Sequence, residues 1–270
     1  MQALFGIVDF NFILAIGVGM ARIYPCTFLI PAFSFEYLKG LPRHAIVFAL
    51  ALIPAPGIKE VLSVEHYGVL FVAGMAAKEL LLGALIGILL ALPFWLFESV
   101  GALFDSQRGA LLGGQINPNY GPSDTPSGRL FRDITVYLLV ITLGFHGLVQ
   151  LIWDSYRLWP PSLWFPQLTD DGFHVFLSAL NDTFSDIVLY AAPFVCVLLL
   201  IDFGMGIMTL FSPQLNVFVL SGPLKSVIGF AFLLVYLPTL LELIQGQLDR
   251  LPELPAILGQ LLQDPRGGVP

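Results

Sequence analysis

The amino-acid sequence predicts an all-α membrane protein, and three observations support this fold class. Of the 270 residues, 57% are hydrophobic and only 11% are charged, whereas soluble domains carry about 25% charged residues. The mean hydropathy is +0.84. Apolar stretches follow one another along nearly the whole chain. We therefore expect one membrane domain over residues 1–263, with five or six helical spans, and a disordered tail over residues 264–270.

The apolar stretches, taken in order, set the expected helices. A span needs about 20 apolar residues, so the second stretch is short and the third is long enough to extend beyond the hydrocarbon core. The first has no Lys or Arg before Arg22, which favours a retained segment over a cleaved signal peptide. The six stretches cover residues 4–35, 45–58, 67–97, 134–153, 187–211 and 215–244.

Aromatic residues mark the connection between the fourth and fifth stretches. Trp153, Trp159 and Trp164 fall there, as in the aromatic belt at a membrane–water interface. Apolar residues at helical spacing from Phe173 onward predict an amphipathic helix that leads into the fifth stretch. Pro193 is expected to kink that helix.

Nearly every apolar stretch contains an ionisable residue, and such residues usually face protein or water rather than lipid. Lys78 and Glu79 point about 100° apart on a helix, so we expect them not to pair across one face. At least one then needs a partner on another helix or another subunit. A structural ion pair, a subunit contact and a proton relay stay open as roles. The ionisable residues are Asp9, Arg22, Lys78, Glu79, Asp202, Lys225 and Glu242.

Small residues also predict close packing along the third stretch. Gly83 and Gly87 form a small-xxx-small pair on the helix face that carries Glu79, and such pairs let backbones approach closely in membranes. Together with Lys78, these residues are the candidate contacts with neighbouring subunits.

The composition and motifs exclude several classes of protein. A net charge of −7 without a basic run argues against nucleic-acid binding. Cys26 and Cys196 lie in apolar stretches, unlike the cysteines of a disulfide-rich secreted domain. No P-loop, dinucleotide-binding or metalloprotease motif occurs, and the four histidines lack the spacing of metal ligands. We expect no enzyme activity, no cofactor and no metal site.

A polar hinge separates the third and fourth stretches. It begins helical, breaks at Gly113-Gly114 and continues through several prolines over residues 98–132. Irregular backbone beside spans is tolerated where protein buries it or where it lines a water-filled path. One hypothesis is a gate loop whose apolar residues seal a lumen, and the alternative is an ordinary connecting loop. The candidate gate residues are Arg108, Gly109, Leu111, Leu112, Gly113, Gly114 and Ile116.

A second polar hinge separates the fifth and sixth stretches. Pro213 is expected to stop the fifth helix, and Gly222-Pro223 to interrupt the chain again before the sixth. The pattern predicts a helix–elbow–helix hairpin with polar side chains at the bend. The candidate elbow residues are Phe211, Pro213, Gln214, Asn216, Gly222, Pro223 and Lys225.

Together these motifs resemble a known family. The stretch over residues 211–225 looks like the signature of the export-apparatus subunit shared by flagellar and virulence type III secretion systems (the FliR/SpaR/YscT family, or T subunit). The runs at residues 78–87, 105–109, 144–147 and 192–194 agree in order and spacing. The resemblance covers about residues 5–247, and the virulence branch looks closer than the flagellar one.

The resemblance implies a structural channel subunit rather than an enzyme. Members assemble with two smaller hydrophobic subunits (R and S types) and the switch subunit (U type). They form a helical, pseudo-symmetric export gate of kinked helical hairpins in the bacterial inner membrane, raised toward the periplasm and in contact with membrane lipid. Unfolded effector and needle proteins would pass through it.

The resemblance also implies an internal division. The part up to about residue 185 would resemble the larger partner subunit, and the hairpin over about residues 186–250 the smaller one. The alternative function is a stand-alone multi-span secondary transporter, which would place a substrate site near the membrane midplane.

Overall fold

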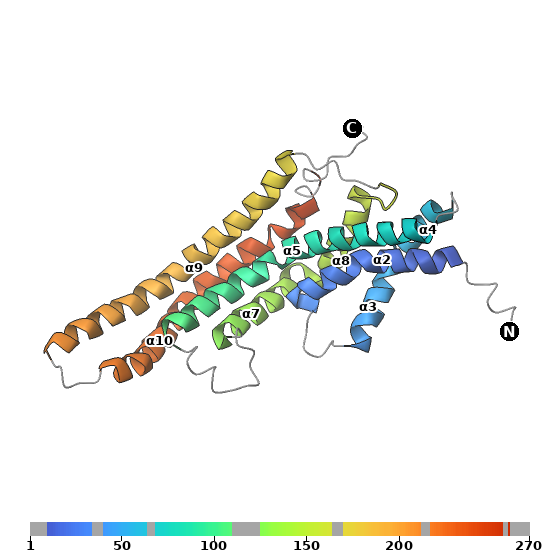
Figure 1. The fold of residues 1–270 in the computed structure, drawn as a ribbon. Helices are drawn as coiled ribbons and strands as arrows, with labels where there is room; N and C mark the ends of the chain where they lie inside the picture. Colours follow the sequence, from blue (N-terminus) through green and yellow to red (C-terminus); the bar gives the residue numbers. More distant parts are fainter. Residues whose placement is uncertain are drawn as a thin grey trace. The chain divides into compact units, whose positions relative to one another are not determined.

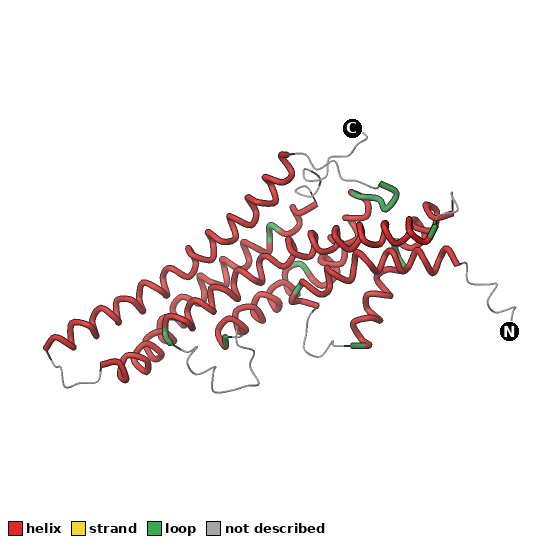
Figure 2. Tube along the Cα trace, in the orientation of Figure 1, coloured by secondary structure: helices red, strands yellow, loops and turns green. Residues whose placement is uncertain are grey.

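The structure is a computed structural model that describes residues 10–33, 40–63, 68–109, 125–163, 170–211, 217–255 and 259. Within these ranges every regular element is helical (Figure 2). Four of the described helices are long and apolar enough to cross a membrane, or up to six spans if each of two broken helix pairs counts as one. The predicted all-α membrane fold is confirmed. The longer helices (Figure 1) are α2 (Phe10–Leu29), α3 (Leu41–Ala51), α4 (Ala55–Ser63), α5 (Val69–Gln107), α7 (Pro126–Thr142), α8 (Gly144–Leu158), α9 (Asp170–Phe211) and α10 (Val217–Leu248).

The contacts within the chain define two compact units. Unit 1 comprises Met1–Leu92, Leu143–Ala179 and Arg250–Pro270, and unit 2 comprises Pro93–Thr142 and Leu180–Asp249. The long helices α5 and α9 each contribute residues to both units. The division expected near residue 185 falls inside α9 and stays a prediction, and the tail over residues 264–270 lies outside the described residues.

In unit 1, α2 contacts both α3 and α4 (Figure 1). The second apolar stretch forms these two helices, which are bent by 64° at their break. Pro54 explains the break because it has no N–H, so the Leu50 carbonyl lacks its donor four residues on. The indole Nε1 of Trp153 on α8 donates to that carbonyl at 3.3 Å instead. The break is therefore stabilised by α8.

The prediction of one helix over residues 134–153 is wrong. The helix α7 ends at Thr142, and α8 begins at Gly144, whose φ is +70°. That left-handed conformation favours glycine and ends a helix readily. The aromatic belt is not seen at Trp159 either, because its side chain is buried in unit 1. Trp164 lies outside the described residues.

In unit 2, α9 and α10 form an antiparallel pair. Asp202 on α9 pairs with Lys225 on α10 at 2.5 Å. Toward the opposite end, Gln247 Nε2 donates to Asp186 Oδ2 at 2.8 Å. The helix predicted ahead of the fifth stretch is confirmed as the first part of α9, which continues through Pro193. Its predicted apolar face is not buried within the chain, because Leu177 and Phe184 are 43% and 67% exposed, and the kink at Pro193 stays a prediction.

The predicted interruption at Gly222-Pro223 is wrong, because both residues lie within α10. A proline removes only one hydrogen bond from a helix, and membrane helices tolerate this where side chains and neighbouring helices satisfy the freed groups. The elbow is therefore shorter than the sequence predicts.

An aromatic core holds unit 2 together. The buried ring of Phe194 on α9 lies 5.0 Å from the centroid of Phe104 on α5 and 5.0 Å from that of Tyr236 on α10. Close backbone contact joins α5 to α7, because a Cβ at Gly101 would lie 2.5 Å from the Ser127 carbonyl oxygen. This core fixes α5, α7, α9 and α10 around one another.

Candidate functional site

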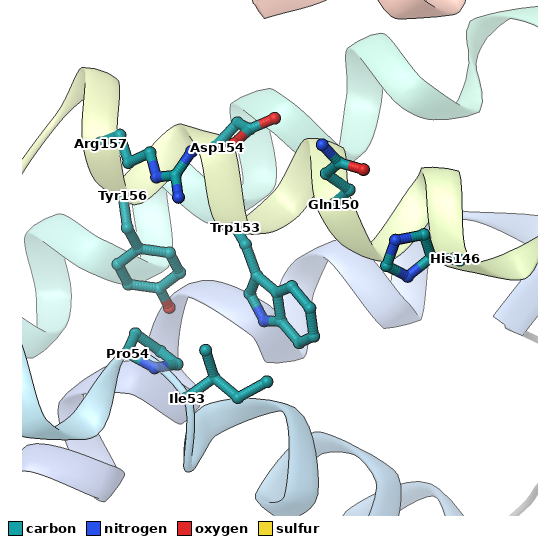
Figure 3. Close-up of a pocket in the computed structure, with 8 residues that line it drawn as sticks. All are labelled: Ile53, Pro54, His146, Gln150, Trp153, Asp154, Tyr156 and Arg157. Carbon is teal, nitrogen blue, oxygen red and sulfur yellow. Dashed lines mark hydrogen bonds and ion pairs between the residues drawn. The ribbon is translucent and has the colours of Figure 1, made fainter.

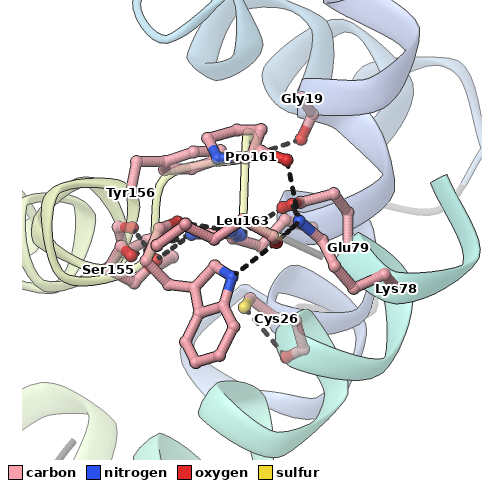
Figure 4. Close-up of polar contacts among 12 residues, drawn as sticks. Gly19, Cys26, Lys78, Glu79, Ser155, Tyr156, Pro161 and Leu163 are labelled. Carbon is pink, nitrogen blue, oxygen red and sulfur yellow. Dashed lines mark hydrogen bonds and ion pairs between the residues drawn. The ribbon is translucent and has the colours of Figure 1, made fainter. Parts of the chain in front are cut away.

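A buried arginine links three helices of unit 1. Arg22 on the apolar helix α2 is fully buried. Its Nε donates to Glu79 Oε2 on α5 at 2.5 Å. Its Nη1 donates to the Ser155 carbonyl at 2.9 Å, and its Nη2 to the Trp159 carbonyl at 2.9 Å. The guanidinium carbon also lies 4.1 Å from the ring centroid of Tyr156. Figure 4 shows how these contacts join α2, α5 and α8.

Lys78 completes this buried charge cluster. Its Nζ lies 2.9 Å from Glu79 Oε1, so the expectation that these neighbours do not pair is wrong. The flexible four-carbon stem of lysine lets the ammonium reach the adjacent carboxylate. The ammonium also donates to the carbonyls of Pro161 and Leu163, at 2.9 and 2.8 Å (Figure 4).

The carbonyls in this cluster come from the end of α8 and the chain that follows it. The last carbonyls of a helix have no partner within the helix and carry partial negative charge. Two cations, Arg22 and Lys78, share the single carboxylate of Glu79, and these carbonyls supply further acceptors. The arrangement matches the structural ion pair among the roles left open by the sequence, and it anchors the end of α8.

The glycine face of α5 lies against α2 in the same chain. A Cβ at Gly83 would overlap the Arg22 backbone, and one at Gly87 would lie 3.1 Å from the Cys26 Cα. Cys26 Sγ donates to the Gly83 carbonyl at 3.1 Å. The close approach that the glycine spacing predicts therefore occurs, with α2 as its partner. Packing of these residues against a neighbouring subunit stays a prediction.

In unit 2, the two ends of the proposed gate loop are tied together at their base. Asp105 on α5 is fully buried, and its carboxylate accepts hydrogen bonds from Ser127 N and Ser127 Oγ, both at 2.7 Å. Arg108 Nη2 lies 2.7 Å from the same carboxylate. Thr125 Oγ1 accepts from Gly128 N at 3.2 Å. Asp105 and Thr125 therefore both cap the start of α7.

Two of the proposed gate residues, Arg108 and Gly109, lie within the described residues. Gly109 follows the end of α5 and has a φ of +79°, as a glycine that ends a helix often does. The other gate residues lie outside the described residues, namely Leu111, Leu112, Gly113, Gly114 and Ile116.

The elbow residues are only partly described. Phe211 is the last residue of α9 and is 83% exposed. Lys225 pairs with Asp202 and also donates to the Gln107 carbonyl at the end of α5, at 3.3 Å. Lys225 thus places a positive charge where the α5 helix dipole is negative. Pro213, Gln214 and Asn216 lie outside the described residues.

Sequence reasoning missed the hydroxyl and carbonyl partners of these charges. Ser127 and Ser155 are small polar residues in helices and gave no signal of their own. The pairing of Lys225 with a carboxylate could have been predicted from the sequence, because Asp202 is another charged residue in an apolar stretch. Among the described residues, no group of three or more His, Cys, Asp or Glu side chains could hold a metal ion.

Comparisons with known proteins place the chain among export proteins. The sequence profile of the family described as "Bacterial export proteins, family 1" matches residues 13–251. The chain is 31% identical to Yop proteins translocation protein T of Yersinia pestis over 80% of this chain and 83% of that protein. It is 29% identical to Surface presentation of antigens protein SpaR of Salmonella typhimurium, over 81% of each. It is 27% identical to Flagellar biosynthetic protein FliR of Bacillus subtilis, over 80% of this chain and 83% of that protein.

Proposed function

Because the chain belongs to the bacterial export proteins, family 1, we propose that it is a structural channel subunit of a type III secretion export gate. Unfolded secreted proteins would cross the bacterial inner membrane through the gate. The names of its relatives support this role, since they refer to protein translocation, surface presentation of antigens and flagellar biosynthesis. The similarity to translocation protein T and SpaR favours a virulence system.

One structural observation carries the proposal, namely the uneven burial of the candidate spans. In an apolar 18-residue window of the α5 span, 67% of the window is buried within the chain, whereas only 17% and 22% of such windows are buried in α9 and α10. Asp202, a charged residue on the sparsely buried α9, keeps 40% of its side chain exposed. A charge at membrane depth usually faces protein or water. We therefore infer that partner subunits cover much of α9 and α10.

The partners we propose are the two smaller hydrophobic subunits, of R and S type, and the switch subunit, of U type. The elbow between α9 and α10 would lie at the closed cytoplasmic end of the gate, with the assembly raised toward the periplasm. The chain would act as a scaffold without enzyme activity.

A mass measurement of the purified complex tests this function. The chain is expressed with and without its R-type and S-type partners and extracted in mild detergent. We expect a stable hetero-oligomer when the partners are present and an unstable chain when they are absent. A chain that is stable alone, as a monomer or small homo-oligomer, would instead support the alternative secondary transporter.

We also propose that the loop after Gly109 helps to seal the lumen. Replacing Leu111, Leu112 and Ile116 together by alanine is expected to raise the ion leak through the assembled gate, because smaller side chains leave a wider opening. Conductance is measured across a planar bilayer, with Leu130→Ala on the exposed surface of α7 as the control. Unchanged conductance in the triple variant would contradict the sealing role.

A further inference from the structure

A hollow of about 410 Å³ lies in unit 1 along α8, facing the break between α3 and α4 (Figure 3). Its volume falls within the range of about 300–1,000 Å³ that is usual for ligand pockets. None of the buried charges described above lines this hollow. The residues that decide its chemistry are Ile53, Pro54, Gln150, Trp153, Asp154 and Arg157.

One rim of the hollow is polar along the whole length of α8. His146, Gln150, Asp154 and Arg157 recur at helical spacing and share one face. The opposite face is buried, with Ile152 only 1% exposed. Lipid chains would not solvate a face that carries an aspartate and an arginine. This face of α8 therefore lies in polar surroundings, that is water, lipid headgroups or protein, although the sequence of α7 and α8 is apolar enough to suggest a span.

The other rim is apolar. Ile53 is 59% exposed and Leu52 is 40% exposed at the break between α3 and α4. The indole of Trp153 points from α8 toward Ile53 and Pro54 (Figure 3). Tryptophan is enriched where membrane meets water because its ring is apolar and its N–H is polar. The hollow thus has one wet rim and one apolar rim, as an amphipathic ligand requires.

The charges of the hollow select the type of ligand. Asp154 Oδ1 and Arg157 Nη1 lie 3.5 Å apart, and their side chains are 27% and 87% exposed. An exposed pair of this kind holds weakly, so each partner is free to bind the opposite charge of a ligand. With one anion and one cation, the site favours a zwitterion over an anion.

We propose that this hollow binds the headgroup of a zwitterionic phospholipid. The phosphate binds Arg157, the ammonium binds Asp154, and the acyl chains extend from the hollow across Leu52 and Ile53. This assignment does not depend on the export role. The lipid would hold the break between α3 and α4 against α8, in addition to the hydrogen bond from Trp153 to Leu50.

Lipid binding by the chain in complex with its R-type and S-type partners tests the proposal. The detergent-solubilised complex is delipidated and titrated with palmitoyl-oleoyl phosphatidylethanolamine or phosphatidylglycerol, and bound lipid is counted by native mass spectrometry. Arg157→Gln is expected to weaken phosphatidylethanolamine binding about tenfold. The control Arg250→Gln removes an exposed cation of the same unit that does not line the hollow, and it should bind as the unmodified chain does.

A second variant tests selectivity in a way that does not depend on overall stability. Asp154→Asn leaves Arg157 as the only charge of the pair, so the preference should shift from phosphatidylethanolamine to phosphatidylglycerol. Equal binding of the two lipids by the unmodified chain would overturn the proposal, as would unchanged binding by Arg157→Gln. Cross-linking of Arg157→Cys to a partner protein segment in the assembled complex would also overturn it.

Discussion

Glu79 is the carboxylate that two buried cations share, and its loss is expected to destabilise unit 1. Glu79→Gln keeps the size of the side chain but leaves Arg22 and Lys78 without a counter-charge. Breaking a buried ion pair in this way costs about 3–5 kcal/mol. We expect a clear fall in the thermal unfolding temperature of the chain purified in detergent with its R-type and S-type partners. Glu253→Gln, on an exposed residue of the same unit, should leave that temperature unchanged, and equal shifts would contradict the role of Glu79.

Two glycines give a matched test of the contact between α2 and α5. Gly83→Ala would push a methyl group into the Arg22 backbone, whereas a methyl group at Gly17 of α2 meets nothing within 4 Å. Overpacking costs about 1–3 kcal/mol, while alanine is the better helix former at an open position. Gly83→Ala should therefore lower the unfolding temperature and Gly17→Ala should keep or raise it. Similar behaviour of the two variants would show that the close approach is not maintained.

At the scale of single residues, the sequence was a better guide to which residues are important than to which groups they contact. Arg22, Lys78 and Glu79 stood out because charges are rare in apolar stretches. Their pairing required the fold, since Arg22 and Glu79 lie 57 positions apart. The carbonyl partners have no sequence signal at all, because every residue carries one.

At the scale of helices, the cap of α7 depends on a residue of another helix. Asp105→Asn would remove the charge of the carboxylate that accepts hydrogen bonds from Ser127 N and Ser127 Oγ. Losing an N-cap interaction costs about 0.5–2 kcal/mol, so amide hydrogen exchange in the first turn of α7 should accelerate roughly tenfold. Asp133→Asn is the control, because Asp133 lies on α7 with its side chain 69% exposed. Equal exchange in the two variants would argue that Thr125 alone caps the helix.

Helix existence was predictable from the apolar stretches, but three helix breaks were not placed correctly. The breaks between α3 and α4 and between α7 and α8 were not expected, and the one expected at Gly222-Pro223 does not occur. Hydropathy measures how apolar a stretch is, and it does not depend on the backbone dihedral angle of a single residue. The fourth stretch remains apolar through Gly144, where one positive φ separates α7 from α8. At Gly222-Pro223 the turn residues suggested a break, yet the helix continues. Glycine and proline lower helix stability, and packing decides whether the helix survives.

At the scale of the whole molecule, hydropathy cannot tell lipid contact from protein contact. Both are apolar, and an average over residues treats them alike. Burial separates them in part, since the α5 span is largely covered by its own chain while those of α9 and α10 are not. The family membership was predictable from motifs in order, because their spacing extends over most of the sequence.

The exposed faces of α9 and α10 lead to a test that separates lipid from partner contact. Phe203 on α9 is 68% exposed in the single chain. If lipid covers it, Phe203→Ala changes little, because lipid tails fill the space. If a subunit covers it, the same change leaves a cavity in a packed interface, and central aromatic residues carry much of the binding energy there. We expect roughly tenfold less R-type and S-type partner to copurify with Phe203→Ala.

Leu70→Ala, at an 88% exposed position of α5 outside the α9–α10 pair, should leave copurification unchanged. Full recovery of both partners with Phe203→Ala would place this face in lipid and remove the main structural support for the gate assembly.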